Sequence, residues 1–145
     1  MSERSGFYPA VGVDAAARTT VSHGGGVLLC DAVRAVGLDR ALSAALAPWH
    51  KPLATHDPAK VVLDLALLLA LGGDCLSDVA LLREQPAVFG RVASDPTVSR
   101  TIDALAADQV RALTAINTAR ALARKAAWTL AGDAAPNHAS ALPRR

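Results

Sequence analysis

Aromatic residues are scarce in this chain: they make up 3% of its 145 residues, as two Trp, one Tyr and two Phe. The strands of a β-sandwich draw heavily on aromatic and β-branched side chains. Hydrophobic residues nevertheless reach 52%, so Ala, Leu and Val must fill the core. This composition favours close-packed helices, and the length is that of one domain. The predicted fold class is therefore mainly α and multi-helical.

Charged residues are also few, at 19%, and the net charge is only +2. So few charges argue against a disordered chain, and so small a net charge does not by itself indicate a nucleic-acid binder. The charge is uneven, however: residues 1–90 carry seven basic and nine acidic side chains, whereas residues 91–145 carry eight basic and four acidic ones. The basic excess belongs either to a binding surface or to the solvated face of a helix that carries Arg120, Arg124 and Lys125.

Long hydrophobic runs are missing as well. Asp64 interrupts the longest one, residues 61–71, and a membrane span takes about 20 apolar residues. The first residues lack the apolar stretch of a secretory signal, so we expect a cytoplasmic protein without membrane contact. Cys30 and Cys75 lie 45 positions apart and form no closely spaced ligand pair. We therefore expect two buried thiols in a reducing compartment and no structural metal site.

Apolar residues recur with helical spacing after the glycine run at residues 24–26. The pattern predicts helices over residues 27–36, 38–47, 57–71 and 76–83, one that starts at Asp95, and one over 108–131. Asp57 and Pro58 are typical of a helix start, and Asp95 and Pro96 repeat that pair. The helix over 57–71 is apolar on nearly every side, so we expect it at the centre of the fold.

The chain divides into three predicted parts. Residues 1–25 hold two short extended runs, at residues 8–13 and 18–22. They are expected to form either a short extended N-terminal arm or one hairpin. Residues 26–131 are expected to form one helical domain. Residues 132–145, rich in small residues and Pro, are expected to fray as a tail.

The helix that starts at Asp95 has the pattern of a recognition helix. Val98, Ile102 and Leu105 fall on one stripe, whereas Thr97 and Arg100 point away from it. The N-terminal amides of such a helix can meet a phosphate, and Arg can form two hydrogen bonds with guanine. Residues predicted to contact DNA are Arg91, Thr97, Ser99, Arg100 and Arg111.

The segment 76–83 would be the supporting helix of a helix-turn-helix-like pair. The gap before Asp95 is about ten residues, which is longer than the usual turn of that motif. The alternative is an ordinary N-capped amphipathic helix.

Motifs for catalysis and cofactors are missing. The glycine run after His23 has no nucleophile elbow to accompany it, and neither a P-loop nor a dinucleotide-binding glycine motif occurs. The four histidines have no ligand spacing and are expected to be solvated loop side chains: His23, His50, His56 and His138. The carboxylates that could serve a two-metal nuclease are Asp57, Asp64, Asp74 and Asp78, but nothing in the sequence brings them together. We therefore expect no catalytic residue, bound metal or cofactor.

Four blocks in a fixed order carry a resemblance: VSHGGGVLL at residues 21–29, DPAKV at 57–61, LALGGDCLSD at 69–78 and VASDPTVSR at 92–100. Together they resemble the N-terminal region of DDE-type insertion-sequence transposases, specifically the insertion-sequence family numbered thirteen-eighty. The resemblance covers about residues 20–137. It implies a helical region that precedes a ribonuclease-H-like domain, whose Asp, Asp and Glu residues bind metal ions.

The resemblance also predicts what this chain lacks. In that family the first catalytic Asp lies on an apolar strand shortly after the position reached here at residues 131–137. Here the last acid, Asp133, is followed by a short tail without a strand pattern. We therefore expect a truncated transposase that is not an enzyme and that binds transposon-end DNA.

Two alternatives remain. One is a helical module that forms a homo-oligomer or associates with full-length transposase through its last helix, with Ile116 and Leu130 on the contact stripe. The other is an intact nuclease.

Overall fold

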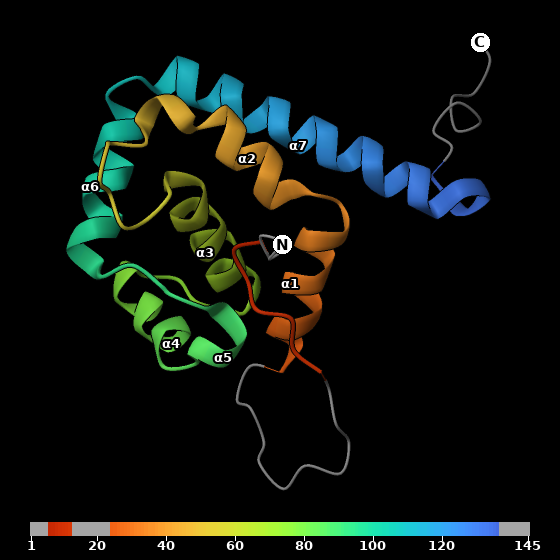
Figure 1. Cartoon of the computed structure of the whole chain (residues 1–145), viewed down its shortest axis with the longest axis horizontal. Coiled ribbons are helices and arrows are strands. Elements are labelled where there is room, and N and C mark those ends of the chain that lie inside the picture. The colour runs from red at the N-terminus through yellow and green to blue at the C-terminus, as the bar shows by residue number, and fades with distance from the viewer. Residues whose placement is uncertain (1–5, 13–23, 137–145) are drawn as a thin grey trace, which may run out of the picture.

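The computed structural model describes residues 6–12 and 24–136, and within these ranges helices alternate with short loops and no strand forms (Figure 1). The mainly α, multi-helical prediction is therefore confirmed. The elements, in chain order, are α1 (Gly25–Ala35), α2 (Leu38–Ala45), η1 (Ala47–Trp49), α3 (Pro58–Ala70), η2 (Leu76–Asp78), α4 (Val79–Arg83), α5 (Pro86–Phe89), α6 (Asp95–Ala106), α7 (Gln109–Ala131) and η3 (Gly132–Ala134).

Two helix ends follow the sequence signals closely. Gly37, between α1 and α2, adopts φ 66°, a left-handed conformation that glycine reaches without steric cost. Asp57 caps α3 because its carboxylate accepts a hydrogen bond from the backbone N–H of Ala59 at 2.8 Å. Pro58 takes the first helical position, where the missing N–H has no partner to lose.

Helix α3 lies at the centre of the molecule, as its apolar sequence predicted (Figure 1). Helix α2 packs along α7 and also against α3, while α1 contacts the short α5. Full burial of one Leu or Val side chain stabilises a fold by about 1.5–3 kcal/mol. The apolar side chains that α3 buries therefore supply a large part of the core: Val61, Leu63, Leu67 and Leu68.

The described part of the N-terminal arm, residues 6–12, crosses the helices without forming a helix itself (Figure 1). Tyr8 is buried, with only 2% of its surface exposed. Arg34 of α1 donates hydrogen bonds to the carbonyl oxygens of Tyr8 at 3.2 Å and Pro9 at 2.9 Å. These contacts fasten the arm to the helical body. The predicted extended run at residues 18–22 and the tail from residue 137 onward lie outside the described residues.

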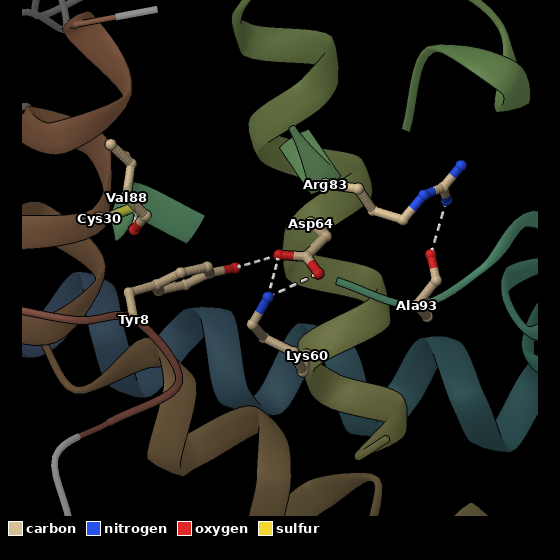
Figure 2. A network of polar contacts seen from close by, with 7 residues as sticks. All are labelled: Tyr8, Cys30, Lys60, Asp64, Arg83, Val88 and Ala93. Carbon is tan, nitrogen blue, oxygen red and sulfur yellow. Dashed lines mark hydrogen bonds and ion pairs between the residues drawn. The ribbon is translucent and has the colours of Figure 1, made fainter. Parts of the chain in front are cut away.

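A buried polar network lies beneath the arm (Figure 2). The ammonium group of Lys60 lies 2.5 and 2.6 Å from the two carboxylate oxygens of Asp64, one turn later on α3. Tyr8 donates its hydroxyl hydrogen to the same carboxylate at 3.0 Å. Asp64 thus interrupts the apolar run of α3 without being left unpaired.

Burial opposes the charge of both members of this pair. It raises the pKa of Asp64 to about 6, although Lys60 and the hydrogen bond from Tyr8 act in the opposite direction. Burial also lowers the pKa of Lys60, and there Asp64 is the group that opposes the shift. Each member of the pair therefore stabilises the charged form of the other at this buried position.

The two cysteines differ in exposure, so the prediction of two buried thiols is wrong for one of them. Cys30 of α1 is buried, and its burial raises the pKa of the thiol to about 11. Cys75 is exposed because it lies in the turn between α3 and η2, with its sulfur 3.1 Å from the Ser77 hydroxyl.

Helix α7 is the longest element, and its C-terminal half extends beyond the other helices (Figure 1). It packs through small residues, because Ala112, Ala119 and Ala123 are buried. Leu130 continues that stripe past the body and is 68% exposed. No helix in the described ranges, α7 included, is both long and apolar enough to span a bilayer.

Candidate nucleic-acid interface

A cavity of about 510 Å³ lies between the loop that follows η1 and one face of α6, from Thr97 to Ala104. Three cationic side chains from three separate segments line it: Lys51, Arg91 and Arg100. All three are exposed, and none forms an ion pair with another residue of the described ranges. We call this cavity the basic cleft. Its other lining residues are Trp49, Ala54, Thr55, His56, Pro58, Thr97, Thr101 and Ala104.

Helix α6 presents its polar face to the basic cleft, as the helical wheel predicted. Val98 is 1% exposed and packs into the core, whereas Thr97 and Arg100 line the cleft. The guanidinium of Arg100 donates a hydrogen bond to the Thr97 hydroxyl at 3.1 Å. The apolar stripe is not buried throughout, because Ile102 is 40% exposed.

The start of α6 is held by Arg83 of α4. The Arg83 guanidinium donates hydrogen bonds to the Ala93 carbonyl oxygen and to the Asp95 carboxylate, both at 2.8 Å; the first is drawn in Figure 2. Asp95 was expected to cap the helix, but Ser94 precedes the first helical residue and the Asp95 carboxylate pairs with Arg83 instead. This ion pair offsets the negative charge of Asp95 at the start of α6, the helix whose polar face lines the basic cleft.

The five residues predicted to contact DNA are not all brought together. Arg91, Thr97 and Arg100 line the basic cleft. Arg111, at the start of α7, lies at its edge, because its guanidinium stacks 5.2 Å from the centre of the Trp49 ring. Ser99 is half-buried and is not among the residues that line the cleft.

The sequence did not assign most residues of the basic cleft to a site, among them Trp49, Lys51 and His56. They lie around a short turn of the chain, where no periodic pattern shows which side chains share a face. His56 was expected to be a solvated loop residue, but it is half-buried. Burial lowers its pKa, and the neighbouring charges of Arg91 and then Lys60 lower it further. His50 is exposed as expected, and His23 and His138 lie outside the described residues.

The carboxylates considered for metal binding are distributed among different tasks. Asp57 caps α3 and accepts a hydrogen bond from Ser43, and Asp64 is buried in its ion pair. The structure does bring Asp74 and Asp78 together, with ligand atoms within 4.8 Å of each other and of Cys75. The sequence had given no reason to expect this cluster.

The Asp74–Cys75–Asp78 cluster has a structural explanation. The Asp78 carboxylate accepts hydrogen bonds from the backbone N–H groups of Asp74 at 3.1 Å and Cys75 at 3.2 Å. These hydrogen bonds lower the pKa of Asp78 and close the turn that starts η2.

One comparison with known proteins identifies the chain. The family model described as "Transposase DDE domain group 1" matches residues 3–144. The chain therefore belongs to this transposase family, which gives it a role in DNA transposition. No curated protein and no solved structure matches the chain.

This match corrects the expectation that the chain is a non-catalytic fragment. That expectation was wrong, because the matching family is a DDE domain family and the match covers nearly the whole chain. It had rested on the absence of a strand pattern with a carboxylate after residue 131, and on carboxylates that the sequence left scattered. Two of these, Asp74 and Asp78, lie close together in the fold.

DDE chemistry implies divalent metal ions, and the Asp74–Cys75–Asp78 cluster does not fit them well. Mg²⁺ takes oxygen ligands, whereas this cluster offers a thiol, which is a soft ligand. The Asp78 carboxylate is also already engaged by two backbone N–H groups. The cluster is therefore a poor candidate for the metal centre of a DDE reaction.

Proposed function

We propose that this member of the transposase family holds double-stranded DNA at transposon ends in its basic cleft. The observation that carries the proposal is that Lys51, Arg91 and Arg100, from three segments, line one cavity without ion-pair partners among the described residues. Cations that form no ion pair on the protein can neutralise phosphates and release the counterions of DNA. A cation already paired on the protein would have to exchange one partner for another.

The chemistry of the α6 face supports this proposal. Arg100 offers a planar fork of donors, which suits a phosphate or a guanine edge. The hydroxyls of Thr97 and Thr101 lie beside it in the basic cleft. Because Arg83 neutralises Asp95, that carboxylate repels an approaching phosphate less than an unpaired acid would.

The order of α4 and α6 supports a helix-turn-helix-like pair, with α6 as the helix that contacts DNA. The segment between them holds the single-turn helix α5, Pro86–Phe89. We place residues 26–131 in this DNA-binding region. The proposed assignment to the insertion-sequence family numbered thirteen-eighty rests on the four sequence blocks within residues 21–100.

Salt-dependent binding tests the proposal. The full chain is titrated against the duplex ends that flank its gene and against a scrambled duplex, at several salt concentrations. We expect affinity to fall steeply with salt. Replacing Lys51, Arg91 or Arg100 by Ala should reduce the slope of log affinity against log salt by about 1 each.

The matched control is Arg120→Ala. Arg120 is an exposed cation of α7 that donates a hydrogen bond to Asn117 and does not line the basic cleft. Its removal should therefore leave the salt dependence of binding unchanged. Absence of binding at low salt, or an equal loss in the control and the cleft variants, would contradict the proposal.

The alternative, that α7 is a surface for self-association or for a full-length transposase, stays a prediction. Of the two residues expected on its contact stripe, Ile116 packs against the core and Leu130 is exposed. Sedimentation of the purified chain over a range of concentrations tests it, because a strictly monomeric profile at high concentration would contradict self-association.

A further inference from the structure

Leu53 has a backbone conformation that leucine rarely adopts. Its φ is 65°, and among the described residues it is the one residue other than glycine with positive φ. The backbone N–H of Ala54 donates to the carbonyl oxygen of Lys51 at 3.1 Å, which closes a four-residue turn. Pro52 and Leu53 occupy the two central positions, and a turn with Pro first and positive φ second favours Gly or Asn at the second. A branched apolar side chain therefore stands where a turn of this kind normally carries a hydrogen atom or a short polar side chain.

The fold itself does not explain this side chain. Leu53 is fully exposed, so packing within the described chain does not offset the strain of its backbone. Strained residues of this kind persist where the surrounding structure imposes them, and they cluster at functional sites. Leu28 and Leu69 are also well exposed, but they lie within regular helices and carry no such strain.

The position of Leu53 connects it with the basic cleft. Its chain neighbours Lys51, Ala54 and Thr55 all line the cleft, so the turn holds the leucine at the rim beside a cation. A DNA backbone bound to Lys51 would place its base pairs next to an exposed apolar side chain on a Pro-containing turn.

From this juxtaposition we propose that Leu53 is a wedge that inserts between adjacent base pairs of the bound duplex and unstacks them. Apolar side chains presented beside cationic contacts kink DNA in this way. Pyrimidine–purine steps, which unstack easily, are the expected targets. This inference rests on the proposed function of the basic cleft, because the wedge acts only on DNA held there.

Base-unstacking fluorescence tests the wedge. The probe is a duplex in which 2-aminopurine replaces adenine at a TA or CA step, and its fluorescence rises when the base leaves the stack. With the wild-type chain we expect the fluorescence to rise on binding. With Leu53→Gly, which suits the turn and removes the side chain, binding should persist while the rise in fluorescence is lost. Leu53→Asn, which also tolerates positive φ, should behave in the same way.

Two controls separate the wedge from other causes. Leu28→Ala removes an exposed leucine of α1 that does not line the basic cleft and should leave the fluorescence rise intact. Leu53→Met keeps an apolar side chain and should retain the rise. If both Leu53→Gly and Leu53→Asn bind DNA with an undiminished rise, the wedge is overturned while the basic cleft stands. If the wild-type chain binds no duplex at low salt, the proposed function itself fails.

Discussion

Tyr8 donates its phenolic hydrogen to a carboxylate oxygen of Asp64 at 3.0 Å, although 56 residues separate the two in the chain. The same tyrosine ring lies 4.6 Å from the Lys60 ammonium group, measured to the ring centre. One aromatic side chain of the N-terminal arm thus contacts both charges of the buried pair in α3. The arm and the central helix therefore share one polar network, so a substitution in one should change the stability of the contacts made by the other.

Removing one partner of the buried pair should cost more stability than neutralising both. Lys60→Met leaves the Asp64 carboxylate buried without its cation, and we expect a loss of about 3–5 kcal/mol in the free energy of unfolding. In the double variant Lys60→Met/Asp64→Asn neither charge of this pair remains, and the Asn oxygen can still accept from Tyr8, so the loss should be smaller. Urea unfolding of the wild type, both single variants and the double variant measures this difference. If the double variant lost as much free energy of unfolding as the two single variants added together, the expected coupling of Lys60 and Asp64 would be contradicted.

The raised pKa of Asp64 should make stability fall as pH rises. The carboxyl group has a pKa of about 6 in the folded chain against an ordinary 3.8, so folding favours its protonated form. This contribution is fully present below pH 3.8, and it is lost as pH rises through about 6.

Asp64→Asn cannot ionise at this position and should remove that part of the pH dependence. Urea unfolding at several pH values across this interval, for both chains, checks it. Asp103→Asn changes an exposed carboxylate of α6 and serves as the control. The same pH profile in Asp64→Asn and the wild type would contradict the expected linkage.

Two neighbouring glycines of α1 should respond in opposite ways to alanine. A Cβ atom added at Gly26 would lie 2.6 and 2.9 Å from ring carbons of Phe89, which is fully buried. The new methyl group would force this buried ring to move within the core, so Gly26→Ala should cost about 1–3 kcal/mol.

A Cβ at Gly25 would meet nothing within 4 Å, so Gly25→Ala should leave the stability unchanged or raise it by up to about 1 kcal/mol. Thermal melting of both variants against the wild type measures the contrast. Equal melting temperatures for the two variants would show that Phe89 does not limit the approach of α1.

Local sequence signals were sufficient for most helices because they act within one or two turns. The hydrogen bond from Ala59 to Asp57 spans two residues, and the left-handed conformation of Gly37 concerns one backbone position. The start of α6 was predicted less well. There the Asp95 carboxylate pairs with Arg83, a residue 12 positions away whose proximity depends on how α4 packs.

By itself the sequence determined that the chain is mainly helical, that α3 is central and that α6 presents Thr97 and Arg100 on one face, because these properties follow from helical periodicity. Only the tertiary structure placed Lys51 and His56 beside Arg91 and Arg100. The packing of α3, α6 and the loop between η1 and α3 decides that arrangement. The same holds for Tyr8, which lies 56 residues from Asp64 in the chain yet donates to its carboxylate. The pairing of Lys60 with Asp64 is local to one turn of α3. Only packing decides that this pair is buried and meets a tyrosine, because a buried charge needs partners that can lie far away in the sequence.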